Sequence, residues 1–256
     1  MEPTNASSGD RRVSQGLELL FLGSGNAFAA GRYWSSFLLN RRYLFDASPV
    51  ALPHLKQCQV APEEIEAIFI SHFHADHFFG LPFLLLEYAE LARRTTDLTI
   101  VGPPGIQERL RVITEVGYPN VPTKEKTYRE HYLELADGLT GEVAGLKFVA
   151  RSVTHVDDLE CFGFRVELGG RTVAYSGDSM MCDALTELAD GADVFVVECS
   201  CWDGTCGPHL GPDDVRELRR RLGPKPTFIL THLDTGTQDL GIENVLIADD
   251  LARFNL

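Results

Sequence analysis

Short apolar runs recur along the chain, and turn residues separate them. Runs of roughly four to eight mostly apolar residues bounded by glycine, asparagine or aspartate are typical of strands. The pattern predicts strands at residues 18–22, 36–39, 43–46, 65–70, 98–101, 146–153, 162–168, 172–175, 193–198 and 227–231. The sequences Asn40-Arg41-Arg42 and Gly169-Gly170-Arg171 lie between pairs of these runs and predict hairpins.

Longer amphipathic segments lie between the later strands. They predict helices at residues 50–57, 79–93, 103–116, 183–189 and 211–222. Residues 119–131 show no period, so we expect a loop or a lid there. No linker rich in glycine, proline or serine divides the chain. We therefore expect two mixed sheets packed face to face with helices outside, in one domain at 17–256 after a flexible tail at 1–16.

Composition and charge limit the partners of the protein. The 256 residues are 44% hydrophobic, which is enough for a large core, and carry a formal net charge of −14. That charge argues against broad contacts to nucleic acid phosphates. No run of eighteen apolar residues predicts a membrane span, and the polar N-terminus lacks the apolar core of a signal peptide. The six cysteines show no disulfide spacing, so we expect a cytoplasmic protein.

The densest group of candidate metal-ligating residues follows the apolar run at 65–70. Its sequence Ser-His-Phe-His-Ala-Asp-His brings His72, His74, Asp76 and His77 within six positions. Imidazole and carboxylate ligands together suit zinc and similar first-row metals. An accidental polar loop is the alternative, but histidines packed this closely would repel one another on protonation. The cluster therefore predicts a metal site at the end of a buried strand.

Three further polar residues also follow predicted strands. His155 comes after 146–153, Asp178 after 172–175 and His232 after 227–231. Each alone would be an ordinary loop residue. Because all three share a chain with the first cluster and occupy the same position relative to a strand, we expect them to join it.

This order of residues resembles the metallo-β-lactamase superfamily. The resemblance extends from Phe21-Leu22-Gly23-Ser24-Gly25 to Ala248-Asp249-Asp250 and implies an α+β fold, the four-layer αβ/βα sandwich. It also implies two divalent metal ions, Zn²⁺ or alternatively Mn²⁺ or Fe²⁺, and a bridging hydroxide as nucleophile. The implied ligands of the first ion are His72, His74 and His155, those of the second are Asp76, His77 and His232, and Asp178 bridges the two.

Four features resemble the ribonuclease Z-like branch of that superfamily. They are the Gly23-Ser24-Gly25 turn, the sequence after His77, the string Tyr-Ser-Gly-Asp-Ser at 175–179, and the pair formed by Glu198 and His209. In that branch the histidine protonates the leaving oxygen and the glutamate orients it. This implies catalytic roles for Asp76, Glu198 and His209, although an ordinary loop histidine before the 211–222 helix is the alternative for His209.

One departure from that branch bears on the substrate. Enzymes of the branch that process tRNA carry a long arm between the positions of His155 and Asp178, where this chain has only residues 156–177. The short spacing resembles small phosphodiesterases of the carbon–phosphorus lyase pathway. Two divalent ions also bring more positive charge than two carboxylates and a hydroxide remove, so the site would attract a small anionic substrate.

The resulting prediction is a phosphodiesterase that acts on a small or cyclic phosphodiester, with no nucleic acid or membrane partner. The alternatives are a hydrolase of carbon esters, thioesters or lactones, a ribonuclease Z-type RNA endonuclease, and a metal-binding protein without turnover. A homodimer is expected only by analogy with relatives.

Weaker signals have two interpretations each. Cys199, Cys201 and Cys206 either bind an extra metal or sense oxidation, or are ordinary core and loop cysteines. Asp46 either hydrogen-bonds a metal-ligating histidine or caps a turn.

Two further groups flank the predicted metal site. Lys124, Lys126 and Arg129 either line the substrate mouth or belong to a solvated loop. Phe78, Phe79 and Phe83 are expected in the core beneath the metal site.

Overall fold

The structure is a computed structural model that describes residues 16–92, 94–202 and 207–256. The predicted tail at residues 1–16 lies outside the described residues, apart from Gly16. Leu17 exchanges two backbone hydrogen bonds with Leu256, so the start of the described chain lies beside its carboxyl end.

Within the described residues, the strands form two seven-stranded mixed sheets. The first has the order β14 (Arg253–Asn255), β1 (Glu18–Gly23), β2 (Ser36–Leu39), β3 (Tyr43–Phe45), β4 (Ala67–Phe69), β5 (Leu98–Gly102) and β6 (Glu130–Glu134). The second has the order β13 (Val245–Ile247), β12 (Thr227–Thr231), β11 (Val194–Glu198), β10 (Arg171–Tyr175), β9 (Cys161–Leu168), β8 (Leu146–Val153) and β7 (Thr140–Val143).

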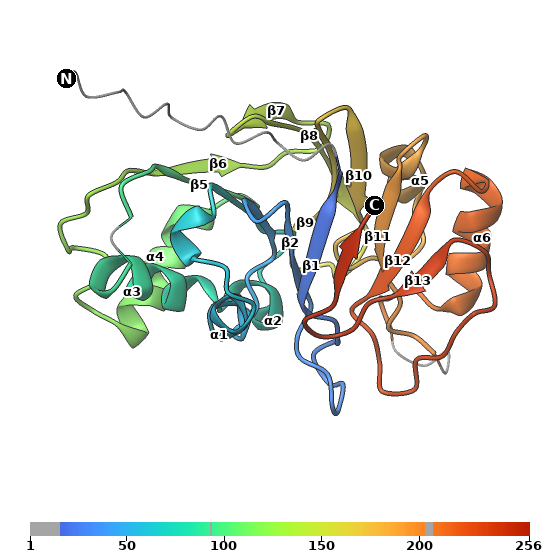
Figure 1. The fold of residues 1–256 in the computed structure, drawn as a ribbon, viewed down its shortest axis with the longest axis horizontal. Coiled ribbons are helices and arrows are strands. Elements are labelled where there is room, and N and C mark those ends of the chain that lie inside the picture. Colours follow the sequence, from blue (N-terminus) through green and yellow to red (C-terminus); the bar gives the residue numbers. More distant parts are fainter. Residues whose placement is uncertain (1–15, 93, 203–206) are drawn as a thin grey trace, which may run out of the picture.

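Helices cover the outer faces of both sheets (Figure 1). On the first sheet lie α1 (Ala51–Gln57), the short 3₁₀ helix η1 (Pro62–Glu64), α2 (Ala75–Phe78), α3 (Leu81–Glu90) and α4 (Ile106–Gly117). On the second lie α5 (Asp183–Ala189) and α6 (Pro212–Leu222). The predicted α+β fold, a four-layer αβ/βα sandwich, is therefore confirmed.

Aromatic side chains fill the space between the two sheets. Phe45 stacks on Phe37 at a ring-centroid distance of 4.8 Å and on Phe69 at 5.0 Å. Phe164 of the second sheet meets Phe69 edge-on at 5.5 Å. Alternating residues of β8 point into this core, and Lys147 between them points to solvent, which is the period-two pattern of a half-buried strand.

The directions of the strands bring several loops to one edge. Because β9 is antiparallel to both β8 and β10, these two strands run the same way, and β11 and β12 are parallel to β10. In the first sheet β3 and β4 are parallel. Segments that follow strands of the same direction leave each sheet on the same side, which is where ligand sites of α/β sheets form.

The structure differs from the predicted elements at the sheet edges and at one helix. The four edge strands β6, β7, β13 and β14 were not predicted, and the predicted 79–93 helix is the shorter α3, which a separate short helix, α2, precedes. Gly80 separates these helices, and a Cβ atom there would lie 2.1 Å from the carbonyl oxygen of Ser48. The close approach allows no side chain at this position, and it holds α2 against the loop after β3.

The described part of the chain contains no helix with the length and apolarity that crossing a bilayer requires.

Candidate metal centre

All seven predicted metal ligands lie at one edge of the sandwich, after strands of both sheets. His72 and His74 follow β4, and Asp76 and His77 lie in α2. The ligands from the second sheet follow three different strands: His155 comes after β8, Asp178 after β10 and His232 after β12. The loops therefore bring residues that are up to 160 positions apart in sequence into contact.

The donor atoms converge into three groups, and Asp178 belongs to two of them. The first group is His72, His74, His155 and Asp178, the second is Asp76, His77 and His232, and the third, which overlaps both, is Asp178, His209 and His232; each could hold a metal ion. Nδ1 of His74 lies 2.9 Å from Nε2 of His72 and 3.3 Å from Nε2 of His155. Oδ2 of Asp178 lies 3.3 Å from Nε2 of both His77 and His232, so this oxygen faces the second group as well.

The outward ring nitrogens of four histidines are held by protein groups. Nδ1 of His77 donates to Asp46, Nδ1 of His155 to the carbonyl of Pro208, Nδ1 of His232 to Ser200, and Nδ1 of His72 to Ser71. A proton on Nδ1 leaves Nε2 with a free lone pair directed at the centre of the cluster. Such partners fix the tautomer of metal-ligating histidines, so the donor set fits divalent cations.

Asp178 provides an independent sign of a cation site. Its side chain is buried, and its Oδ1 has no hydrogen-bond partner among the described residues. A buried carboxylate oxygen without a partner is rare and costly unless an ion or water satisfies it. Which residue binds which ion stays a prediction.

The pKa shifts in the cluster indicate which side chains are neutral and which are charged. Burial, together with the neighbouring His77, holds the pKa of His72 well below its usual value, so this imidazole is neutral. Burial opposes the charge of His77, but the surrounding carboxylates hold its pKa well above its usual value, so His77 must lose a proton before it can bind a metal. Burial opposes ionisation of Asp178, but His232 and His77 hold its pKa well below its usual value. Neutral imidazoles and ionised carboxylates are the states that bind metal.

Asp46 is linked by hydrogen bonds to one histidine of the first group and one of the second. It follows β3, is fully buried and adopts a left-handed backbone conformation with φ of 53°. Its Oδ2 accepts hydrogen bonds from His77 at 2.8 Å, from the Tyr175 hydroxyl at 2.6 Å and from the Ser71 hydroxyl at 2.9 Å. Because Ser71 in turn accepts from His72, one carboxylate orients a histidine of each of these two groups. Of the two interpretations of Asp46, the structure supports the contact to a histidine.

The predicted pair of Glu198 and His209 lies beside the same cluster. Nδ1 of His209 donates to Oε1 of Glu198 at 2.9 Å. Glu198 is fully buried, and its Oε2 accepts from Ser200, the serine that also contacts His232. Burial lowers and the hydrogen bond from Glu198 raises the pKa of His209, and the net direction is upward. Their catalytic roles stay predictions.

A cavity of about 500 Å³ opens onto the cluster. Its lining residues are Asn26, Ala27, Phe28, His74, Ala75, Asp76, Asp178, Ser200, Pro208, His209 and His232. Ser200 and the segment at 26–28 were not predicted to line the site. Ser200 could have been suspected from its position two residues after Glu198, whereas nothing in the spacing singled out Phe28.

Several weaker expectations are corrected. Phe78 is buried, but Phe79 and Phe83 are 45% and 40% exposed, because α2 ends at Phe78 and neither of the other two rings continues its buried face. Lys124 and Lys126 form ion pairs with Glu90 and Glu130 and do not line the cavity at the cluster.

The two described cysteines of the 199–206 segment have different states. Cys199 is a free, buried thiol, which fits the core interpretation. Cys201 is disulfide-bonded, so the expectation drawn from spacing is wrong for this residue, because the fold rather than the spacing decides which sulfurs meet. Cys206 lies outside the described residues.

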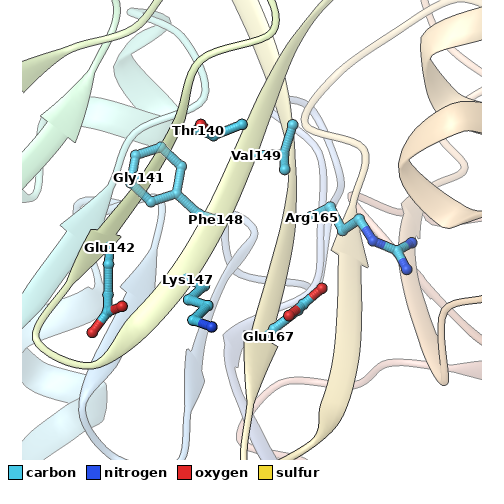
Figure 2. Close-up of a pocket in the computed structure, with 8 residues that line it drawn as sticks. All are labelled: Thr140, Gly141, Glu142, Lys147, Phe148, Val149, Arg165 and Glu167. Atoms are coloured by element: carbon cyan, nitrogen blue, oxygen red, sulfur yellow. The ribbon is translucent and has the colours of Figure 1, made fainter.

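A second hollow, of about 390 Å³, lies on β7, β8 and β9 (Figure 2). The strand register places Lys147 opposite both Glu142 and Glu167, so charges of opposite sign alternate across the strands. None of the residues that line this hollow is a histidine or cysteine, so it lacks the donors that define the cluster.

Comparisons with known proteins agree with this geometry. Residues 41–233 match the family model described as "Beta-lactamase superfamily domain". A ribonuclease Z from Methanosarcina mazei is 27% identical over 308 aligned positions, which cover 94% of this chain and 98% of that protein. A ribonuclease Z from Bacillus licheniformis is 29% identical over 93% of this chain and 94% of its own length.

Solved structures show the same fold. Human tRNase Z, short form, superposes with a TM-score of 0.75 at 22% identity and covers 93% of this chain and 98% of its own. A diphosphatase from the PhnP family superposes with a TM-score of 0.72 at 18% identity over 93% of this chain and 97% of its own. Because the superfamily model matches residues 41–233, most of the chain, the protein belongs to the metallo-β-lactamase superfamily of hydrolases.

Proposed function

We propose that this hydrolase is a dinuclear metal-dependent phosphodiesterase that acts on small or cyclic phosphodiesters. The observation that carries the proposal is the hydrogen bond between half-buried His209 and buried Glu198, because the imidazole of His209 lines the same cavity as the candidate metal ligands. Two divalent cations, when bound, supply a water of lowered pKa and neutralise charge on the phosphate.

His209 has the surroundings of a proton donor to the leaving group. Its Nδ1–H is held by Glu198, which leaves Nε2 as the nitrogen that can carry the transferable proton. The raised pKa keeps a fraction of this imidazole protonated near neutral pH. Protonation of the leaving oxygen matters most for alkoxides, which are poor leaving groups. A phosphodiester of an ordinary alcohol needs such a donor, whereas an activated ester does not.

The substrate class follows from size and charge. A cavity of about 500 Å³ is within the usual range for small-molecule sites. The chain carries a net charge of −14, which does not favour contacts to many phosphates. The relatives named ribonuclease Z would favour an RNA substrate. However, the alignment with one of them spans 308 positions and this chain has 256 residues, so at least 52 positions have no counterpart here.

A substrate panel tests the proposal. The protein is loaded with zinc or manganese and assayed with bis-p-nitrophenyl phosphate, a 2′,3′-cyclic nucleotide, a lactone, a thioester and a tRNA precursor. We expect turnover of the first two. Turnover of only the lactone or thioester would make the protein a carbon ester, thioester or lactone hydrolase instead, and turnover of only the tRNA precursor would make it an RNA endonuclease. If no substrate is turned over, a metal-binding protein without catalysis is supported.

A matched pair of histidine variants tests the role of the proton donor. His209→Ala should lower the rate by about 100-fold on a diester with an alkoxide leaving group and much less on one with p-nitrophenolate. His131→Ala is the control, because His131 is half-exposed and pairs with Asp97 on the surface. Equal losses on both leaving groups in His209→Ala would contradict proton donation.

A further inference from the structure

The most exposed large apolar side chain of the described residues lies at the rim of the cavity that opens onto the metal cluster. Phe28 is 94% exposed and lines this cavity together with His74, Asp76 and His209. A single exposed apolar residue on a protein surface needs no explanation. Its position at the mouth of the candidate active site, however, places its ring where a bound substrate would meet it.

The segment that carries Phe28 is tied to the site at several points. Gly25 forms isolated β-bridges with Trp34 and with Leu233, the residue after His232. The backbone N–H of Asn26 donates to the carbonyl of Leu233 at 2.9 Å, and that of Phe28 donates to Oδ1 of Asn26 at 2.9 Å.

A further contact fixes the far side of the same loop. The backbone N–H of Ala30 donates to the hydroxyl of Thr235 at 3.0 Å. The backbone at Phe28 is therefore held at a defined place beside the segment that carries His232. Less backbone freedom is then lost when a ligand packs on the ring.

The remaining cavity wall offers little other apolar surface. Apart from Phe28, its carbon-only side chains are Ala27, Ala75 and Pro208, which are small, and its other aromatic rings are the imidazoles of the cluster. The imidazoles and carboxylates would face the phosphate. Phe28 is thus the lining side chain that provides a flat apolar face for a group next to the phosphate.

We propose that Phe28 determines substrate specificity by stacking on a flat aromatic ester group of the phosphodiester, such as a nucleoside base. This inference rests on the proposed phosphodiesterase function and narrows its substrate class. Stacking between a base and an aromatic side chain typically changes binding by about 5- to 150-fold. The aromatic group is the one that stays on the phosphate, and the leaving group lies on the side of His209.

The test uses diesters that share one leaving group and differ in the group that is retained. Methyl, cyclohexyl and phenyl p-nitrophenyl phosphate are compared by kcat/KM in the metal-loaded protein, with thymidine 5′-p-nitrophenyl phosphate as the nucleoside form. We expect the wild-type protein to prefer the phenyl and thymidine diesters over the methyl diester by about 10-fold. The cyclohexyl diester should lie near the methyl one.

Three variants separate stacking from other effects. Phe28→Ala should lower the ratio of kcat/KM for the phenyl diester to that for the methyl diester toward one, and Phe28→Trp should keep the wild-type ratio. Val116→Ala, which changes another exposed apolar residue that does not line the cavity, should leave this ratio at the wild-type value. Equal rates on phenyl and cyclohexyl diesters, or an unchanged preference in Phe28→Ala, would overturn the role of Phe28 while the proposed function stands. If even the methyl diester is not hydrolysed, the proposed function fails and this inference fails with it.

Discussion

Asp46→Asn keeps the shape of a fully buried side chain but replaces one of its two acceptor oxygens with a donor. Asp46 accepts four hydrogen bonds, from the backbone and hydroxyl of Ser71, from His77 and from Tyr175. Asparagine tolerates the left-handed conformation at this position about as well as aspartate does, so the substitution adds no backbone strain. The effect of the change is therefore confined to hydrogen bonding.

Neither orientation of the new amide satisfies its neighbours. With its oxygen toward the Ser71 backbone, the NH₂ group faces Nδ1 of His77, which must then give up its proton and accept. The proton moves to Nε2, the nitrogen that points at Asp178 and His232, and blocks it as a ligand. With the amide reversed, its NH₂ group faces the backbone N–H of Ser71, so two donors meet. In the wild-type protein this N–H donates to Oδ1 of Asp46 at 2.7 Å, and the variant leaves it without that acceptor.

The magnitudes follow from these two conflicts. A buried donor left without an acceptor costs about 1–3 kcal/mol, so we expect the free energy of unfolding to fall by that amount. Loss of a partner that orients a ligating histidine typically lowers metal affinity by about 10- to 100-fold. The loss of metal affinity should appear at the ion site predicted for His77 and, through Ser71, at the ion site predicted for His72.

Competition with a chromophoric chelator measures the metal affinity, and urea denaturation of the metal-free protein measures the stability. Asp97→Asn is the matched control, because Asp97 also accepts a hydrogen bond from a histidine but is half-exposed. We expect no change in metal affinity there and little change in stability. If Asp46→Asn bound zinc as tightly as the wild-type protein, the reasoning about the His77 tautomer would be refuted.

Three further changes have defined outcomes. Asp178→Ala should reduce the metal content from two ions toward one by plasma emission, since its Oδ2 faces the first and second groups, and two retained equivalents would refute the bridge. Phe69→Ala removes a ring between the two sheets and should lower the free energy of unfolding by about 3–5 kcal/mol in urea, whereas Leu246→Ala at the surface should cost far less. Removal of metal with EDTA should abolish hydrolysis and lower Tm, and zinc or manganese should restore both; hydrolysis that survives EDTA would exclude metal-dependent chemistry.

The hydrophobic pattern was sufficient where a strand or helix buries one face. The predicted strand at 146–153 and helix at 183–189 agree with β8 and α5, and the predicted hairpin agrees with β9 and β10 within one residue. The pattern failed for β6 and β7, whose residues are mostly exposed or half-buried. Each lies at an edge and forms by backbone pairing to β5 or β8, which leaves little periodic signal in the side chains.

The site residues that could be predicted were those with a metal-ligating side chain at a position directly after a predicted strand. Histidines and aspartates directly after buried strands identified the cluster, and the structure brings all seven together. Ser200, Tyr175 and Phe28 were not found, because their importance depends on which side chain lies opposite. A serine or tyrosine near a strand end is common, and only the fold shows that these contact His232 and Asp46.

The cluster draws His72, His74, Asp76 and His77 from one sheet and His155, Asp178 and His232 from the other. A cation bound there contacts residues from both sheets. Its binding free energy therefore stabilises the packing of one sheet on the other, in addition to the aromatic side chains between them. At a free ion concentration about 100 times the Kd, the gain per site is about 2.7 kcal/mol. Metal starvation should therefore shorten the lifetime of the protein toward proteases, independently of any loss of turnover.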